Sequence, residues 1–336
     1  MEFYGTIGPA CGNRERLAGM FYHGMTGVRL NLSHMCLQDA AFWISEIHMA
    51  AERVGITPQI LIDLQGPELR IGEFKNPKEY VLKAFETIYL GTEQEENQIP
   101  VTKKFLDEVF EGQSILLDDG KIMLKVVKKD AERVCCNILI GGVLKQKKSI
   151  ALPGVEIAMP TLTQMDIENL HLAKQYGVTG VMLPFVRGRE DIMNLKAALR
   201  EADAEDICIF AKIENFSGVD ALEEIIEEAD TVVIARGDLG NAMPLWELPA
   251  VQKKIAKRCQ EKGRKFMVVT QMLASMETSA VPTRAEVSDI FNAVLDGADS
   301  VMLTGETAAG RYPEDAIRYL VKTVESAEKF LQESIE

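Results

Sequence analysis

Two stretches decide the fold of this chain: Ile207-Cys-Ile-Phe-Ala-Lys-Ile-Glu-Asn215 and Val232-Val-Ile-Ala-Arg-Gly-Asp-Leu-Gly240. Each is a short apolar run that ends abruptly in charged residues. Apolar runs of this length between amphipathic helical patterns are typical of strands buried on both faces, as in a parallel sheet covered by helices. The charged residues Lys212, Glu214 and Asp238 therefore fall where two such strands end.

Two of these residues, Glu214 and Asp238, form a candidate site for a divalent cation. Burying such charges in a core would cost more free energy than packing gains, so we expect them at a mouth where a ligand or ion compensates them. Carboxylates from neighbouring strand ends match the usual way of holding magnesium, with water and substrate oxygens completing the shell. A surface ion-pair cluster is the alternative, because such clusters also gather at strand ends.

The pattern of apolar run and helix recurs along the whole chain. Eight runs are candidate buried strands, at 3–7, 27–30, 59–62, 180–183, 207–211, 231–235, 265–269 and 300–303. Helical patterns alternate with them, at 14–23, 37–54, 165–176, 189–202, 220–229, 248–262, 285–295 and 313–331. Strict alternation implies parallel pairing, and eight such units favour an α/β fold of the eight-stranded (β/α)8 TIM barrel type.

Residues 71–152 interrupt this alternation after the third strand. Without these 82 residues the chain would have 254, close to the roughly 250 typical of such a barrel. The segment contains alternating or β-branched runs at 80–82, 87–90, 114–117, 122–127 and 134–139, and a turn at Asp118-Asp-Gly120. We therefore predict a barrel formed by 1–70 and 153–336, with a small all-β lid domain inserted at 71–152.

Composition limits the partners and the compartment. The formal net charge of −14 disfavours nonspecific binding to nucleic acid. No apolar run approaches the roughly 20 residues that span a bilayer, and the N-terminus lacks a secretory signal pattern, so we expect no membrane partner and a cytoplasmic location. Six cysteines without a CxxC spacing indicate free thiols, and four unclustered histidines argue against a zinc site.

A barrel of this type carries its functional residues at the C-terminal ends of its strands and in the loops that follow. A single charged residue at a strand end could simply be a solvent-exposed side chain, but six of the predicted strands are followed by ionisable or hydroxyl side chains. These side chains are Arg29, Asn31, Ser33, His34, Asp63, Glu68, Arg70, Lys212, Glu214, Arg236, Asp238, Thr270, Thr304 and Glu306.

Longer motifs in the same segments carry a family resemblance. They read Thr6-Ile-Gly-Pro9, Arg29-Leu-Asn-Leu-Ser-His34, Gly66-Pro-Glu68, Lys212-Ile-Glu-Asn215, Ala235-Arg-Gly-Asp-Leu-Gly240, Thr270-Gln-Met-Leu273, Pro282-Thr-Arg-Ala-Glu286 and Gly305-Glu-Thr-Ala308. In this order they resemble the pyruvate kinase family over the whole barrel. The resemblance implies transfer of a phosphoryl group from phosphoenolpyruvate to ADP, giving pyruvate and ATP in the last step of glycolysis, with Mg²⁺ or Mn²⁺ and K⁺ as cofactors.

The resemblance also implies the roles of the strand-end residues in the reaction. Arg29 and Arg70 would grip phosphate oxygens, and Lys212 would stabilise the phosphoryl group and the enolate oxygen that develops as this group leaves. Glu214 and Asp238 would hold the divalent ion. An all-oxygen shell for K⁺ would consist of Asn31, Ser33, Asp63 and the backbone carbonyl of Leu64, with Glu68 matching the residue of potassium-requiring members.

Further roles implied by the resemblance concern the carboxylate of the substrate and the proton. The backbone amides of Gly237 and Asp238, with the hydroxyl of Thr270, would bind the carboxylate, since amides at a helix start attract anions. Thr304 and Glu306 would relay the proton that converts enolpyruvate to pyruvate, through water. The alternative for both threonines is that they complete hydrogen bonds at strand ends.

Nucleotide contacts are the last set that the resemblance implies, and they would come from Arg29, Asn31, His34, Arg70, Asp118 and Lys148. Alternatives stay open here, because His34 with Ser33 could cap the following helix, Asp118 is a turn-forming residue, and Lys148 could be a solvated charge. The usual aromatic, glycine-rich string after the histidine is Met35-Cys-Leu-Gln-Asp39 in this chain. The adenine contacts are therefore expected to differ.

The C-terminal regulatory domain of the family has no counterpart in these 336 residues, so we expect no allosteric response to sugar phosphates. A homo-oligomer through the barrel is possible. Two other functions remain alternatives at this point. One is a metal-dependent lyase or enolising enzyme acting on a pyruvate-like acid, which would need Lys212, Glu214 and Asp238 but neither a lid nor Arg70. The other is a relative of pyruvate kinase that binds ligands without turnover.

Overall fold

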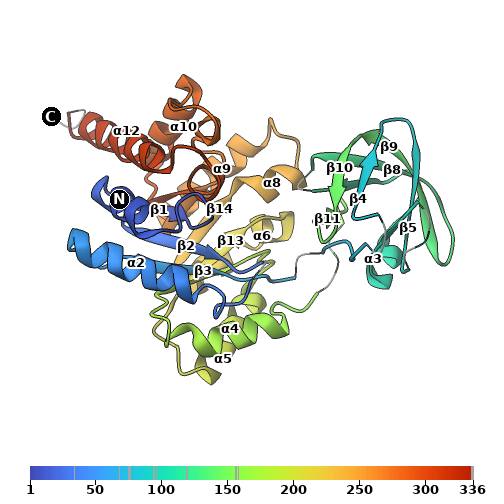
Figure 1. The fold of residues 1–336 in the computed structure, drawn as a ribbon, viewed down its shortest axis with the longest axis horizontal. Helices are drawn as coiled ribbons and strands as arrows, with labels where there is room; N and C mark the ends of the chain where they lie inside the picture. The colour runs from blue at the N-terminus through green and yellow to red at the C-terminus, as the bar shows by residue number, and fades with distance from the viewer. Residues whose placement is uncertain are drawn as a thin grey trace. The chain divides into compact units, whose positions relative to one another are not determined.

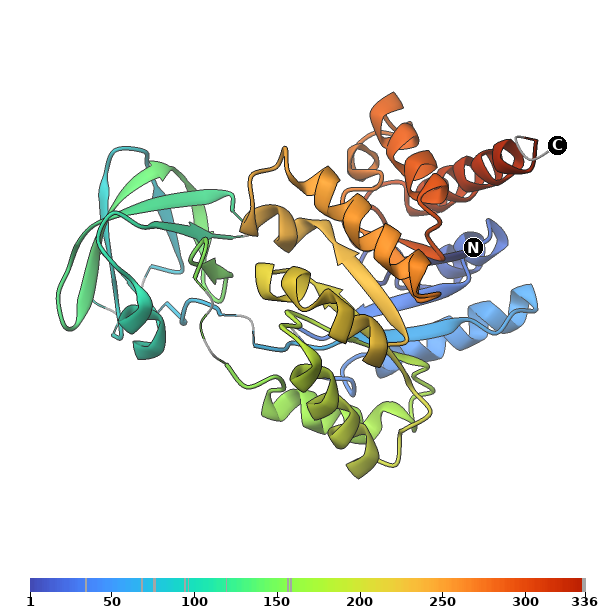
Figure 2. The ribbon, with the colours of Figure 1, turned by 180° about the vertical axis from the view of Figure 1, so that it is seen from behind.

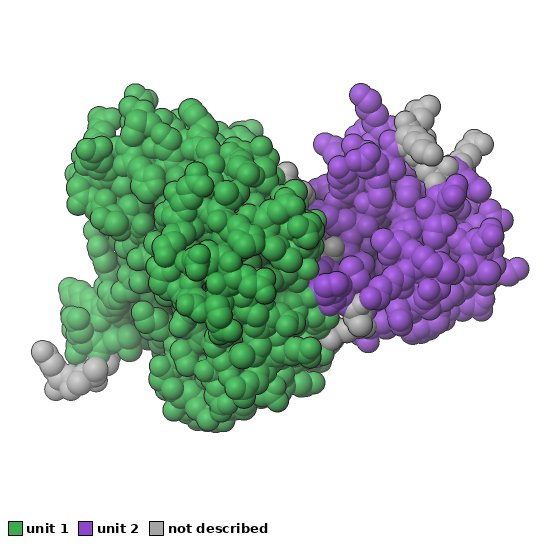
Figure 3. Space-filling view, turned by 90° about the horizontal axis from the view of Figure 1, so that it is seen from below, with its two compact units in different colours: residues 1–66, 161–239, 246–336 green, residues 67–160, 240–245 purple. Residues whose placement is uncertain are grey.

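The computed structural model describes residues 1–33, 35–67, 69–74, 77–93, 95, 97–118, 120–155, 157 and 159–333. They form two compact units, which Figure 3 colours separately. The first unit comprises Met1–Gly66, Thr161–Leu239 and Trp246–Glu336, and the second comprises Pro67–Pro160 and Gly240–Leu245. His34 and Glu68, which the sequence assigns to the nucleotide and K⁺ sites, lie outside the described residues.

The first unit contains a closed barrel of parallel strands. Its strands follow one another in the order β1, β16, β15, β14, β13, β12, β3 and β2. Their bounds are β1 (Glu2–Thr6), β2 (Gly27–Asn31), β3 (Gln59–Asp63), β12 (Gly180–Leu183), β13 (Cys208–Ile213), β14 (Thr231–Ala235), β15 (Lys265–Val269) and β16 (Ser300–Leu303). Figures 1 and 2 show the helices of this unit on the outside of the strands. The prediction of an eight-stranded (β/α)8 TIM barrel is confirmed.

Apolar side chains fill the inside of the barrel, because alternate residues of each strand point inward. Tyr4, Leu61 and Phe210 belong to this buried cluster. Glycines on neighbouring strands make room for them: a Cβ atom on Gly27 would overlap the ring of Tyr4, and one on Gly180 would lie 2.5 Å from Leu61 and 2.8 Å from Phe210. Small residues on some strands thus make room for large residues on others. The closely packed interior fixes the positions of the strands and of the residues at their ends.

The helices between the strands mostly begin and end where the sequence indicates. Their bounds are α1 (Arg14–Tyr22), α2 (Ala41–Val54), α4 (Gln164–Ala173), α5 (Arg189–Glu201), α6 (Phe216–Asp220), α7 (Leu222–Glu228), α9 (Leu248–Glu261), α10 (Arg284–Leu295) and α12 (Pro313–Glu333). Two differences concern α2, which begins four residues later than predicted, and the segment predicted as one helix at 220–229, which is divided between α6 and α7. Among the described residues, none of the helices has both the length and the apolar character needed to cross a bilayer.

The second unit is built mainly from β-strands. A six-stranded sheet has the order β11, β7, β8, β9, β5 and β6, and a two-stranded sheet pairs β10 with β4. Their bounds are β4 (Glu79–Leu82), β5 (Thr87–Gly91), β6 (Gln98–Pro100), β7 (Ser114–Leu117), β8 (Ile122–Lys129), β9 (Arg133–Ile140), β10 (Gly142–Lys145) and β11 (Ile150–Ala151). The short helix α3 (Lys103–Glu108) was not predicted from the sequence, because six residues are too few to show a helical period.

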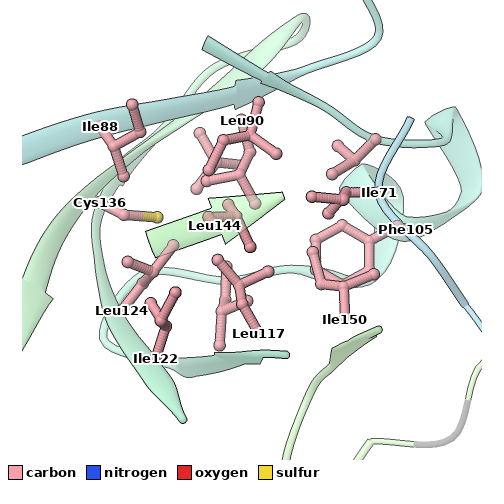
Figure 4. Packing of buried hydrophobic residues seen from close by; sticks show 14 of the residues in the cluster. Ile71, Ile88, Leu90, Phe105, Leu117, Ile122, Leu124, Cys136, Leu144 and Ile150 are labelled. Carbon is pink, nitrogen blue, oxygen red and sulfur yellow. The ribbon is translucent and has the colours of Figure 1, made fainter. Parts of the chain in front are cut away.

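This second unit has a hydrophobic core of its own, which Figure 4 shows from close by. Residues that alternate along β8 and β9, such as Leu124 and Cys136, point into it together with Phe105 of α3. Each fully buried side chain of this size contributes roughly 1.5–3 kcal/mol through removal of apolar surface from water. The unit therefore has the packing expected of a separate small domain.

Candidate functional site

A cluster of opposite charges lies at the ends of β2, β3 and β13. Asp63, the last residue of β3, accepts hydrogen bonds at Oδ2 from Nε of Arg29 at 2.9 Å and from Nη2 of Arg29 at 2.5 Å. The Nζ atom of Lys212 lies 3.2 Å from the same oxygen and 3.3 Å from Oδ1. Arg29 also donates from Nη1 to the hydroxyl of Thr6 at 3.2 Å. The structure thus brings together three residues that the sequence predicted at strand ends.

The charges of this cluster stabilise one another although they are buried. Burial acts to raise the pKa of Asp63, but the nearby Lys212 and Arg29 hold this pKa below its ordinary value. Burial acts in the opposite direction on Lys212, and Asp63 and Glu214 outweigh it, so that the pKa of the ammonium is raised. The charged form of Lys212 is therefore favoured, and the site presents cations beside carboxylates.

Glu214 is held by Lys212 of β13 and by the loop after β12. It is 3% exposed, and its Oε1 atom lies 2.9 Å from Nζ of Lys212. Its other oxygen accepts the backbone N–H of Phe185 at 2.8 Å, in the loop after β12. Phe185 has a φ of 52°, in the left-handed region that a bulky residue rarely adopts. This contact could not be predicted from the sequence, because a backbone amide has no effect on the pattern of side chains.

The second proposed ligand of a divalent cation, Asp238, lies in the first turn of α8 (Arg236–Ala242), which begins directly after β14. Its charge raises the pKa of Lys212, although less than the charges of Asp63 and Glu214 do. The part of the chain that the structure describes contains no group of three or more His, Cys, Asp or Glu arranged to hold a metal ion. If Glu214 and Asp238 hold a divalent cation, oxygens of a substrate and of water would complete its shell.

The proposed K⁺ ligands lie on adjacent strand ends. Asn31 and Asp63 are paired in the register of β2 and β3, and the N–H of Leu32 donates to the carbonyl of Asp63 at 2.9 Å. Ser33 donates its N–H to Oδ1 of Asn31 at 3.1 Å. Leu64 follows Asp63 directly, and its N–H is bound to the neighbouring strand β12. The proposed donors are all oxygens, and oxygens are the ligands that suit a hard cation.

Thr270, at the end of β15, has a backbone φ of 76°, which is strained for a β-branched residue. The guanidinium of Arg236 holds it there by donating to the carbonyl of Thr270 from Nη2 at 2.7 Å and from Nε at 3.2 Å. Asp289 of α10 fixes this guanidinium at 2.6 Å. A Cβ atom on Gly237 would lie 3.0 Å from Cγ2 of Thr270, so the start of α8 and the threonine are in close contact.

Thr304 and Glu306 lie together after β16, at the start of α11 (Gly305–Ala308). Glu306 is only 1% exposed. One of its oxygens accepts the backbone N–H of Leu273 at 3.0 Å, and the other accepts the N–H of Thr304 at 2.7 Å and its hydroxyl at 3.3 Å. The carboxylate therefore joins the loops after β15 and β16, and both of its oxygens are occupied.

The remaining predicted residues, Arg70, Asp118 and Lys148, belong to the second unit. Arg70 forms an antiparallel bridge with Ser149 and donates from Nη1 to the carbonyl of Lys147 at 2.8 Å. Lys148 lies 2.8 Å from Oδ1 of Asp118. Burial acts to raise the pKa of Asp118, but the lysine outweighs this effect and lowers it. Within this unit, Lys148 thus compensates the charge of Asp118.

Known proteins resemble this chain over most of its length. A family model described as "Pyruvate kinase, barrel domain" matches residues 2–317. The chain is 40% identical to the pyruvate kinase of Geobacillus stearothermophilus over 97% of this chain and 57% of that protein. It is 39% identical to a pyruvate kinase of Staphylococcus epidermidis, over 96% and 56%, and 37% identical to that of Mycobacterium intracellulare, over 95% and 68%. The chain thus spans little more than half the length of the first two relatives.

Proposed function

Since the chain belongs to the pyruvate kinase family, we propose that it transfers the phosphoryl group of phosphoenolpyruvate to ADP, forming pyruvate and ATP. The observation that carries the proposal is the position of Lys212, whose charged ammonium lies between the carboxylates of Asp63 and Glu214 at the strand ends. Phosphoryl transfer depends on positioning and on neutralising negative charge, and a fixed cation at this place supplies both.

The basic residues would act on the phosphoryl group. Arg29 is held by Asp63 with its planar guanidinium oriented, so little freedom is lost when it binds phosphate oxygens. Lys212 would neutralise the charge that grows on the enolate oxygen as the phosphoryl group departs. Glu214 and Asp238 would hold a divalent cation, and their two carboxylates fit Mg²⁺ or Mn²⁺. Such an ion would supply further positive charge to the transferred group.

We propose that Asn31, Ser33, Asp63 and Leu64 hold K⁺ in the same region. The support is the pairing of Asn31 with Asp63 in register, which brings an amide oxygen and a carboxylate to one place. A bound K⁺ would offset the negative charge that the two substrates bring. Asp63, which is only 2% exposed, would then serve the cation, Arg29 and Lys212 together.

For the substrate carboxylate we propose the amides of Gly237 and Asp238 with the hydroxyl of Thr270. The close contact of Gly237 with Thr270, and the bonds that hold the strained Thr270, support a preorganised pocket. Thr304 remains the proposed proton donor toward enolpyruvate, through water. Glu306 is better assigned to positioning Thr304, because both of its oxygens already accept backbone amides.

We also propose that the second unit serves as a lid that contributes Arg70, Asp118 and Lys148 to the nucleotide. The sequence assigns His34 to the same role. The presence of this separately packed unit favours a kinase over the lyase alternative, which has little use for it. The cytoplasmic location and a homo-oligomer remain predictions from the sequence.

One experiment tests the proposed activity. Pyruvate release from phosphoenolpyruvate is measured with a coupled enzyme in the presence of Mg²⁺, K⁺ and ADP, and separately with GDP and without any nucleotide. We expect release that requires a nucleoside diphosphate, and no release by Lys212→Met above roughly a hundredth of the wild-type rate. Pyruvate formation without nucleotide would favour a lyase or phosphatase, and binding without release would favour a non-catalytic relative.

A further inference from the structure

Helix α4 carries a carboxylate that contacts a functional loop. Asp166 is completely buried, with 0% exposure. Its Oδ1 atom accepts the backbone N–H of Gln65 at 2.8 Å, and its Oδ2 atom accepts the N–H of Gly66 at 3.0 Å. The same Oδ2 also accepts the N–H and hydroxyl of Thr163, at 2.9 and 2.8 Å, in the capping box of α4. Asp166 thus fixes both its own helix and a loop 100 residues away in sequence.

A second residue of the same helix contacts another loop. Asn169 is 1% exposed, and its Oδ1 atom accepts the backbone N–H of Leu37 at 2.8 Å. Residues three apart in a helix lie on the same face, so Asp166 and Asn169 point from one face of α4. This face therefore holds two segments of backbone, the loop after β3 through Gln65 and Gly66, and the loop after β2 through Leu37.

These loops contain the residues proposed to bind K⁺. Leu64, whose carbonyl is a proposed ligand, is directly followed by Gln65, and Ser33 lies four residues before Leu37. Gly66 has a φ of 58°, and a Cβ atom there would overlap Pro184, so the loop is packed closely against Pro184 as well as bound to Asp166. A shift of the amides of Gln65 and Gly66 would move the carbonyl of Leu64 with them.

We propose that Asp166 and Asn169 are positioning residues for the monovalent cation, which they serve by holding the loops after β2 and β3 in the geometry of the ion shell. This inference rests on the proposed K⁺ site. A purely structural role as a helix cap would account for the bonds of Asp166 to Thr163, but not for its bonds to Gln65 and Gly66. Groups that orient metal ligands without touching the metal change affinity by about 10–100-fold when they are replaced.

The test compares variants that break different bonds of this helix. Asp166→Asn keeps the size of the side chain but places an amide N–H₂ against backbone donors, and Asn169→Ala removes only the acceptor for Leu37. Thr163→Ala is the control for loss of the helix cap, because it leaves the bonds to Gln65 and Gly66 intact. Glu168→Gln is the control for a change on the exposed face of α4. If Asp166→Asn fails to fold, Asn169→Ala still decides the question.

Two measurements need no catalysis. Hydrogen exchange of the amides of Gln65, Gly66 and Leu37 reports whether the loops are held. The thermal unfolding midpoint is measured as K⁺ replaces tetramethylammonium. The K⁺ concentration at which half of the increase in midpoint is reached reports the affinity for the ion. In Asp166→Asn we expect faster exchange of these amides and a half-saturating K⁺ concentration about tenfold higher than in the wild type. In Asn169→Ala the half-saturating K⁺ concentration should increase less. Both controls should keep the wild-type affinity for K⁺. The K⁺ activation curve of pyruvate release should shift by the same factor.

The outcomes separate this inference from the proposed function. If the wild type responds to K⁺ and Asp166→Asn responds at the same concentration, the positioning role is overturned while the K⁺ site stands. An equal loss of affinity in Thr163→Ala would also overturn it, since the effect would then come from the helix cap. If the wild type shows no response to K⁺ beyond that to tetramethylammonium, the proposed ion site itself fails, and the inference fails with it.

Discussion

The Nζ atom of Lys212 lies 2.9 Å from Oε1 of Glu214, the carboxylate that we propose for the divalent cation. The lysine and the metal would thus compete for one oxygen, because the other oxygen of Glu214 accepts the amide of Phe185. Without a cation, the ammonium compensates the buried carboxylate. A cation held by Glu214 would take over this compensation and would leave the ammonium available to the substrate. The proposed binding of metal would in that case be linked to the proposed action of Lys212.

The first prediction concerns Lys212→Met. Turnover should fall about a hundredfold, roughly 3 kcal/mol, because the charge on the enol oxygen grows only as the phosphoryl group departs. The affinity for Mn²⁺ should not weaken, because a positive charge that competes for Glu214 is removed. Steady-state kinetics and paramagnetic relaxation measure the two quantities. An unchanged turnover with only a raised KM for phosphoenolpyruvate would contradict the assignment.

The second prediction tests whether Glu214 and Asp238 form one divalent site. Glu214→Ala and Asp238→Ala should each abolish Mn²⁺ binding and activity. The double variant should then be only slightly worse than either single one, because groups that act as a unit are not additive. Asp220→Ala, an exposed change on α6, serves as the control. A normal Mn²⁺ isotherm in Asp238→Ala would remove that residue from the site.

The third prediction separates the roles of Thr304 and Glu306. Thr304→Val should slow the exchange of deuterium from water into the methyl group of pyruvate, followed by NMR, with little change in stability. Glu306→Gln should lower the free energy of unfolding by about 1–3 kcal/mol, because an amide N–H₂ would face buried backbone donors. If Glu306→Gln instead kept full stability and lost only the methyl exchange, the glutamate would be part of the proton relay.

The barrel could be predicted from sequence because a strand buried on both faces gives a continuous apolar run. Strands such as β12, β14, β15 and β16 begin and end where these runs do. The short helices α8 and α11, which carry Asp238 and Glu306, escaped prediction because one or two turns show no period. They matter to the site, since they turn the backbone directly after a strand.

Contacts between side chains and the backbone amides of distant loops were the part of the site that the sequence could not indicate. The amide of Phe185 binds Glu214, and those of Gln65 and Gly66 bind Asp166. In the sequence Asp166 has the pattern of a helix cap with Thr163, which accounts for only part of its contacts. Its partners lie about 100 residues away, and only the closed barrel brings α4 next to the loop after β3.

The last prediction concerns pH and the loop after β12, where Asp191 of α5 binds Arg187. Oδ2 of Asp191 accepts the backbone N–H of Arg187 at 2.9 Å and its Nε at 3.0 Å, and Oδ1 accepts Nη2 at 2.7 Å and the hydroxyl of Thr161 at 2.5 Å. Burial acts to raise the pKa of Asp191, but Arg187 and Thr161 outweigh it and hold the pKa below the ordinary 3.8. The unfolded chain therefore binds the proton more tightly, so this stabilisation is fully present above the unfolded pKa and is lost as the pH falls through the folded pKa.

We expect Asp191→Asn to lower the free energy of unfolding at pH 7 by about 1–3 kcal/mol, and by progressively less below about pH 4, as the carboxyl of the native protein is protonated. Urea unfolding at constant KCl measures this, with the exposed Asp206→Asn as control; a loss that is equal at pH 7 and at pH 3 would show that the charge of Asp191 contributes nothing.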